Sequence, residues 1–335
     1  MIARVLAAVS VTAMLVGGTA LLSAGSQQDG PRTPQTLAEF EELFAEVSNW
    51  GRWGDDDELG TLNLLTPEKR RQAAGLVQEG ISVSLSHDLI TEEAADMPNP
   101  FEITNGGSLF RYGFHSTTHT HFDALCQFDY KGQLYNGFQI SDVKGPDGCA
   151  VQGAEKLKDG IVTRGILLDI PRLKGLPYLE PGTPVLVEDI LAWEEQAGVK
   201  VEPGDAIFLR TGRWARRAEL GPWQLYPAPP GDGEAGYHVS TVSWMKERDV
   251  MMVGADVSND VTPAGVGEEV LAEVRLMPVH SLTIVAMGIY IVDAMDLEAV
   301  AETAARLNRW EFMVTGAPIR AVGGTGGMLN LTATF

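Results

Sequence analysis

Three of the six histidines in the chain, His115, His119 and His121, lie within seven residues and are followed by Asp123. In an extended segment, side chains alternate between two faces, so His119, His121 and Asp123 would point the same way. Two imidazoles and one carboxylate are ligands that Zn²⁺ and similar ions prefer. The spacing therefore predicts a divalent-cation site on residues 114–123. The structural alternatives are a polar strand that faces water, or histidines hydrogen-bonded within a core.

A second pair of polar residues, His280 and Asp293, flanks a strongly apolar stretch at residues 281–292. A carboxylate beside such a stretch costs free energy unless it is paired or bound to a metal ion. Taken alone, His280 fits a hydrogen-bonded core histidine better than a ligand. The pair therefore indicates a metal site only when it is considered together with the histidine cluster at residues 114–123.

Helical and strand-like segments mix along the whole chain. Thr36 and Glu39 form a capping box, which predicts a helix that begins at Leu37. Further helices are predicted at Pro67–Glu79, Glu188–Ala197, Thr241–Arg248 and Asp296–Leu307. Strands are predicted at Ile81–Leu85, Gly165–Ile170, Ala206–Leu209, Val250–Val253, Leu282–Ile291 and Phe312–Thr315. This mixture favours one α/β domain around a mixed sheet.

Composition excludes several classes of partner. With 45 acidic and 25 basic residues, the net charge of −20 argues against a nucleic-acid partner, because Lys and Arg must neutralise phosphates. Two cysteines, Cys126 and Cys149, exclude a disulfide scaffold and a Cys-rich zinc module. They could pair in an oxidising compartment. We expect instead that Cys126 packs beside the metal-binding segment.

The first residues have the layout of an export signal. A basic residue, an apolar centre and small residues lead into the polar Ser26, which predicts a signal peptide over residues 1–26. Residues 27–35 then form a leader, and residues 36–335 form the folded domain. The alternative is an uncleaved membrane anchor. After cleavage we expect an exported protein, periplasmic or secreted, with no stable membrane association.

Several spaced motifs resemble the cyclase family of metal-dependent hydrolases, which includes bacterial kynurenine formamidase, isatin hydrolase and trans-dienelactone hydrolase. The segments that carry the resemblance are Trp50–Gly54, Glu58–Asn63, Thr118–Cys126, Tyr135–Gly137, Thr163–Asp169, Gly204–Gly212, Gly254–Asp256, Val292–Leu297, Trp310–Phe312 and Gly323–Gly326. They extend over nearly the whole of the predicted domain. The resemblance implies a mixed, partly barrel-like central sheet flanked by helices.

The resemblance also implies a ligand set for one or two ions, usually zinc or manganese. His121 and Asp123 match the His-x-Asp pair of the family, and His280 matches its distant histidine. Asp293 stands where the family usually has Glu, and it is one methylene shorter. His119 is where the small formamidases often have Gly, although some longer members are similar to this chain. All five residues, counting His119, are candidate metal ligands.

Two departures from the family pattern concern the chemistry. Thr117 stands four residues before His121, where the small formamidases have a histidine, and this puts a second ion in doubt. Gln127 stands where they have the histidine that acts as a base. A glutamine amide does not titrate, so it cannot be a general base, but it could orient a water or the substrate carbonyl. Asp293, His119 and His115 remain as proton acceptors, and a His115–His119 pair is an alternative register.

The chemistry that the resemblance implies is hydrolysis of a small cyclic or N-acyl amide, or a lactone, by a metal-activated water. The alternative is a family member that binds a small ligand or metal without turnover. We expect the substrate pocket to include Trp50, Trp53, His115 and His238. Asp256 is equally a site residue or a structural one. Family members are commonly homodimers or homotetramers, and we expect the same here, with a small molecule as the other partner.

Overall fold

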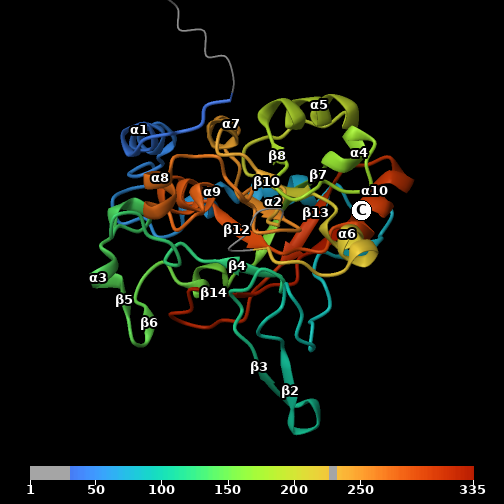
Figure 1. Ribbon diagram of the computed structural model, residues 1–335, viewed down its shortest axis with the longest axis horizontal. Helices are drawn as coiled ribbons and strands as arrows, with labels where there is room; N and C mark the ends of the chain where they lie inside the picture. Colours follow the sequence, from blue (N-terminus) through green and yellow to red (C-terminus); the bar gives the residue numbers. More distant parts are fainter. Residues whose placement is uncertain (1–30, 226–231) are drawn as a thin grey trace, which may run out of the picture. The chain divides into compact units, whose positions relative to one another are not determined.

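A curled, mixed nine-stranded sheet lies at the centre of the computed structural model, which describes residues 31–225 and 232–335 (Figure 1). In spatial order its strands are β1 (Ser82–Ser84), β15 (Thr332–Thr334), β13 (Glu311–Gly316), β7 (Ile161–Asp169), β9 (Ala206–Arg210), β11 (Met252–Ala255), β12 (Tyr290–Asp293), β4 (His121–Asp123) and β14 (Gly326–Met328). The expected mixed α/β fold is confirmed. The predicted signal peptide and residues 27–30 of the leader lie outside the described residues.

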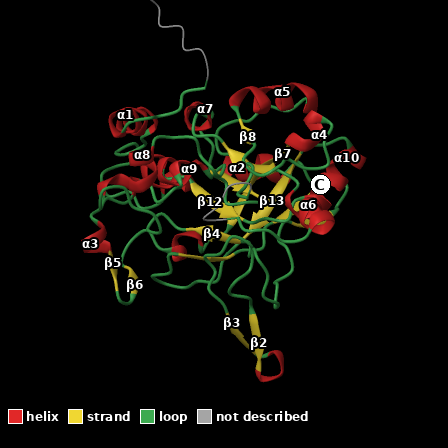
Figure 2. Cartoon of the chain, viewed as in Figure 1, coloured by secondary structure: helices red, strands yellow, loops and turns green. Residues whose placement is uncertain are grey.

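The four central strands, β7, β9, β11 and β12, are parallel, whereas the pairs on both sides of them are antiparallel. Parallel neighbours need crossover connections, and here each crossover contains helices. The helices are α1 (Leu37–Val47), α2 (Pro67–Ala74), α3 (Ile140–Val143), α4 (Ile170–Lys174), α5 (Val187–Ala197), α6 (Arg213–Leu220), α7 (Thr241–Glu247), α8 (Glu268–Glu273), α9 (Pro278–His280) and α10 (Glu298–Leu307). Figure 2 shows most of these helices around the strands.

Short elements complete the described chain. The 3₁₀ turns are Gly60–Leu64, Asn105–Gly107, Tyr135–Gly137 and Ala154–Leu157, and Ser281–Met287 forms a π-helix. Three two-stranded sheets pair β8 (Pro184–Val185) with β10 (Gly236–Tyr237), β2 (Glu102–Thr104) with β3 (Leu109–Arg111), and β5 (Lys144–Gly145) with β6 (Gly148–Cys149). Within the described residues, no helix has the length and apolar character needed to cross a membrane.

Local signals in the sequence located most elements but misread two of them. The capping box of Thr36 and Glu39 is present at the start of α1. The predicted strand at 282–291 is wrong for its first half, which is the π-helix, and Gly288 (φ +68°) separates that helix from β12. A fully buried apolar run carries no periodicity that distinguishes helix from strand. The helix from Pro67 also ends at Ala74, five residues earlier than predicted.

The C-terminal glycines bring β14 against β4. Gly326 lies opposite Asp123 in the antiparallel pair of β4 and β14. A Cβ atom at Gly326 would lie 2.2 Å from the carbonyl oxygen of Phe122, so only glycine allows this close approach. The tail thereby fixes one side of the strand that carries the histidine cluster.

Candidate metal centre

Strands β4 and β12 place three of the predicted ligands on one face of the sheet. His121 and Asp123 are two residues apart in β4, and Phe122 between them is buried. Asp293 of β12 pairs directly with His121 across the antiparallel ladder. The Nε2 atom of His121 lies 3.9 Å from Asp123 Oδ1 and 3.8 Å from Asp293 Oδ2. The register therefore brings two carboxylates and one imidazole together.

Helix α9 supplies the distant histidine. His280 Nε2 lies 3.1 Å from Asp293 Oδ2 and 4.0 Å from Asp123 Oδ2. Asp260 holds the histidine from behind: its carboxylate accepts from His280 Nδ1 at 2.6 Å and from the backbone N–H of Val279 at 2.7 Å. Asp123 and His280, far apart in the sequence, thus meet at one point in the fold.

His115 joins the cluster from the loop before β4, with its Nδ1 atom 3.2 Å from Asp123 Oδ1. Among residues 31–225 and 232–335, two groups of three residues have ligand atoms close enough to hold an ion, each with its atoms within 4.8 Å of one another. One group is His115, His121 and Asp123, and the other is Asp123, His280 and Asp293. Asp123 belongs to both, so its two oxygens face two different sets of partners.

The hydrogen bonds of the three imidazoles suit metal ligation. In each ring, the nitrogen that faces away from the cluster has a polar partner: His119 O for His121 Nδ1, Asp260 for His280 Nδ1, and Thr325 Oγ1 for His115 Nε2. Such partners commonly fix the tautomer of a ligating histidine. The Asp123 Oδ1 atom is buried and has no hydrogen-bond partner among the described residues. A buried carboxylate oxygen that makes no hydrogen bond, with the His115 and His121 ring nitrogens 3.2 and 3.9 Å away, fits a divalent cation.

The electrostatics of the cluster point the same way. Burial alone would lower the pKa of His280, but Asp293 and Asp260 raise it well above its ordinary value. Burial would raise the pKa of Asp293, whereas His280 lowers it. The buried carboxylates therefore demand a positive charge, which a proton on His280 supplies when no cation does.

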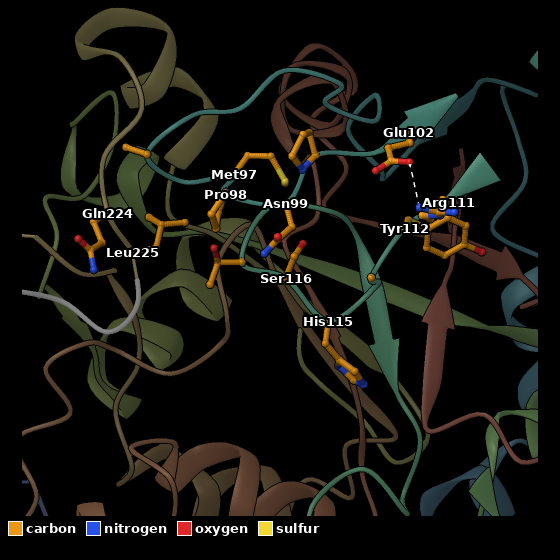
Figure 3. Close-up of a pocket in the computed structure, with 14 residues that line it drawn as sticks. Met97, Pro98, Asn99, Glu102, Arg111, Tyr112, His115, Ser116, Gln224 and Leu225 are labelled. Atoms are coloured by element: carbon orange, nitrogen blue, oxygen red, sulfur yellow. Dashed lines mark ion pairs between the residues drawn. The ribbon is translucent and has the colours of Figure 1, made fainter. Parts of the chain in front are cut away.

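The cluster opens into a cavity of about 230 Å³ that is lined by His115, Ser116, Thr117, His121, Asp123, Gln127, Phe128, Ser258, Met277, His280 and Asp293. A larger cavity of about 800 Å³ shares His115, Ser116 and Thr117 with it. In Figure 3, Gln224 and Leu225 lie on one side of this larger cavity, and the Glu102–Arg111 ion pair lies on the other. His115 is therefore a wall common to both spaces.

His119 does not share the face of His121 and Asp123, which corrects the expectation for residues 114–123. β4 begins only at His121, so the alternation does not extend back to His119. Its Nε2 atom lies 3.4 Å from the Ile90 carbonyl oxygen, and burial lowers the pKa of its ring. The contribution of His119 to the cluster is its backbone carbonyl, which binds His121.

Three residues expected in the substrate pocket lie elsewhere. Trp50 donates from Nε1 to the Val285 carbonyl and packs against Phe44. Trp53 stacks under the Arg52 guanidinium, and His238 contacts Ser240 and Thr33. None of the three lines either cavity, because their segments pack against other parts of the chain. Of the four residues expected there, only His115 reaches the pocket.

Gln127 lines the smaller cavity, as the resemblance to the family's motif implied. The adjacent Cys126 forms a disulfide with Cys149, so the expectation of an unpaired Cys126 is wrong. The loop after β4 returns next to β6, where Cys126 N–H also binds the Gln152 carbonyl at 3.3 Å. This disulfide anchors the loop that carries Gln127.

Sequence reasoning missed the residues that support the cluster from behind. Asn259 donates to Asp293 Oδ1 at 2.6 Å, and Asp260 binds His280. Only Asp256 of the same segment had been singled out, and it accepts four hydrogen bonds at the start of α6 from Thr211, Gly212 and Arg213. The polar run at 256–260 directly after a buried strand was the signal that could have revealed these residues.

Comparison with known proteins agrees with this geometry. A family model described as "Putative cyclase" matches residues 80–260. A solved structure described as a novel cyclase shares 27% identity with a TM-score of 0.72, covering 86% of this chain and all of its own. Isatin hydrolase A from Labrenzia aggregata shares 18% identity with a TM-score of 0.51, covering 78% of this chain and 94% of its own.

A second isatin hydrolase, bound to the product analogue thioisatinate, shares 16% identity with a TM-score of 0.51 and covers 81% of this chain and 97% of its own. No curated protein sequence matches. The fold is therefore that of a mixed α/β cyclase, with a His/Asp cluster that could hold a metal ion. The family model matches more than half of the sequence, and the chain belongs to the cyclase family.

Proposed function

We propose that the protein is a metal-dependent hydrolase of small cyclic or N-acyl amides, or of lactones. The observation that carries this proposal is the convergence of three inward-facing imidazole nitrogens on two buried carboxylates beside a cavity. The chemistry that a Zn²⁺ or Mn²⁺ ion supplies at such a site is activation of water and polarisation of a carbonyl. His115, His121, Asp123, His280 and Asp293 would hold one or two ions.

The sizes of the two cavities favour a substrate whose reacting group is small and whose remaining part is larger. A space of about 230 Å³ beside the cluster accepts a ring or a short acyl group, and about 800 Å³ lies next to it. Isatin, a cyclic amide, is the substrate named for two structural relatives. A ring amide therefore belongs in the first set of substrates tested.

A second candidate function is binding of a metal or small ligand without turnover, and Gln127 favours it. Gln127 occupies the cavity wall but cannot exchange a proton. Under this alternative, the protein takes up metal and yields no product from any substrate.

Metal analysis combined with a substrate panel tests the proposal. We expect the purified protein to contain zinc or manganese, to hydrolyse members of a panel of N-formyl amides, lactones and isatin, and to lose activity on chelation. Re-addition of Zn²⁺ or Mn²⁺ should restore it. Asp123→Ala should abolish metal uptake, because Asp123 belongs to both groups, whereas Asp55→Ala, an exposed carboxylate outside them, should not. Metal bound without any turnover would support the alternative.

We also propose that the protein is exported and forms a homodimer or homotetramer. The Cys126–Cys149 disulfide supports export, because such bonds persist in oxidising compartments. Exposed apolar side chains on the β2–β3 ribbon, Ile103, Leu109 and Phe110, support self-association. Cell fractionation with N-terminal sequencing tests the first proposal, and light scattering on a sizing column tests the second.

A further inference from the structure

Glu234 is a buried carboxyl group behind the wall of the cavity of about 230 Å³, where it contacts the wall residue Ser258. The side chain has no exposed surface, and its Oε2 atom accepts a hydrogen bond from Ser258 Oγ. Its Oε1 atom has no hydrogen-bond partner among the described residues. Backbone hydrogen bonds with Thr262, at 3.0 and 3.2 Å, hold Glu234 in place. A rigidly held buried carboxyl with an unused oxygen is costly, and the costs of such groups are commonly offset by function.

Ser258 connects this carboxyl to the reaction space. The residue is 4% exposed and lines the same cavity as Gln127 and the candidate ligands. The two residues that follow it, Asn259 and Asp260, bind Asp293 and His280 respectively. The position of Ser258 is therefore tied to the cluster through its own backbone.

The charges around Glu234 set how readily it exchanges a proton. Burial raises its pKa to about 7, although Arg213 of α6 and the hydrogen bond from Ser258 lower it, while Asp293 of β12 adds to the rise. Arg213 is itself fully buried and binds the Thr117 carbonyl and Thr118 Oγ1. The carboxyl of Glu234 can thus hold or release a proton near neutral pH.

We propose that Ser258 and Glu234 carry the proton that hydrolysis in this cavity must move. The inference rests on the proposed hydrolase function. As water adds to the substrate carbonyl carbon, its O–H bond breaks and Ser258 Oγ accepts the proton, while the proton of Ser258 passes to Glu234 Oε2. When the C–N or C–O bond of the substrate breaks, the reverse transfer protonates the leaving nitrogen or oxygen. Ser258 and Glu234 return to their starting states, and no proton is gained or lost.

This pair supplies what Gln127 cannot. Gln127 has no titratable group, and His119 is turned toward Ile90. Ser258 lies outside the set of candidate ligands, lines the cavity and binds a buried carboxyl that is not a candidate ligand either. In this arrangement Ser258 contacts the reacting atoms, and Glu234 is a positioning residue that acts through it.

Two probes with different leaving groups test the pair in the metal-loaded enzyme. Acetanilide releases an amine that must be protonated, whereas 4-nitrophenyl acetate releases a stable phenolate. For Glu234→Gln and Ser258→Ala we expect kcat/KM on acetanilide to fall about 100-fold or more. The ester should lose clearly less, because its hydrolysis needs the pair as proton acceptor but its leaving group needs no proton. The double variant should lose no more than Ser258→Ala alone. Glu194→Gln, which alters a buried glutamate of α5 that lines neither cavity, should leave both rates unchanged.

Equal losses on both probes, with metal content and circular dichroism unchanged, would overturn the pair, because a purely structural role does not depend on the leaving group. Absence of turnover of either probe by the wild type would count against the hydrolase function instead. Infrared difference spectra then still test the pair: the band of a protonated carboxyl should disappear as the pH is raised through 7 in the wild type. It should be missing in Glu234→Gln, and a wild type without such a band would refute the inference.

Discussion

Glu234 makes the stability of the protein depend on pH, and Glu234→Gln should remove this dependence. Burial raises the pKa of this carboxyl from 4.5 to about 7 in the folded protein. Each pKa unit corresponds to about 1.4 kcal/mol, so the difference of 7 − 4.5 corresponds to roughly 3.5 kcal/mol. The group is fully buried, so solvent does not screen this effect.

The sign follows from which state binds the proton more tightly. The folded protein holds the Glu234 proton more strongly than the unfolded chain, so this contribution to stability is fully present below about pH 4.5. It is lost as the pH rises through 7. A glutamine carries no proton, so the variant keeps the hydrogen bond to Ser258 without the pH-dependent loss.

Urea unfolding of the metal-free, disulfide-intact protein at several pH values between 5 and 8 measures this. We expect the free energy of unfolding of Glu234→Gln, relative to wild type, to rise by roughly 2.5 kcal/mol across that interval. A difference between the two proteins that stays constant with pH would refute the assignment of a raised pKa to this carboxyl. Equal m-values in both proteins would show that the unfolded states are comparable.

Three further predictions concern the cluster and the larger cavity. Asp260→Asn should weaken metal binding about 10- to 100-fold, because Asp260 orients the His280 ring, and titration with a competing chelator measures the affinity. His119→Gln should leave the metal content unchanged by elemental analysis, since its ring faces Ile90; a loss of one ion would contradict this placement. Tyr112→Trp should raise KM for N-acyl substrates with bulky remainders and leave isatin unaffected, because Tyr112 lines only the larger cavity. A parallel change in KM for both substrates would show that the two spaces do not act separately.

The candidate ligands His121, Asp123 and Asp293 could be predicted because their signals are local. His121 and Asp123 are two residues apart in one short strand and therefore share a face of the sheet. The apolar stretch before Asp293 indicates a carboxylate that needs a partner. The meeting of Asp123 with His280 came from the family resemblance, since only the register of β4 with β12 and the turn before the π-helix bring them together. That register is a property of the whole sheet, which no local pattern encodes.

The errors have a common physical cause in tertiary contacts. His119 was assigned to the ligand face by alternation, but the strand is too short to include it. Trp50 carries the aromatic character of a pocket wall, yet its indole N–H finds the Val285 carbonyl instead. Glu234 gave no signal at all, because an isolated glutamate in a glycine-rich segment reads as an exposed loop residue. Burial of a polar group is decided by what packs over it, and that information lies elsewhere in the chain.

The loss of a titratable group at position 127 need not remove acid–base chemistry from this cavity. A space of about 230 Å³ is small enough that side chains from any of its walls come within reach of the same reacting atoms. Gln127 sits on a loop anchored by the Cys126–Cys149 disulfide, whereas Ser258 sits on the segment anchored to Asp293 and His280. A proton carrier on the Ser258 segment has its position fixed by the same residues that would hold the ion. The distance between Ser258 and a bound cation would then be set by the adjacent residues Asn259 and Asp260, which hold two candidate ligands. Gln127 is therefore free to orient the substrate carbonyl.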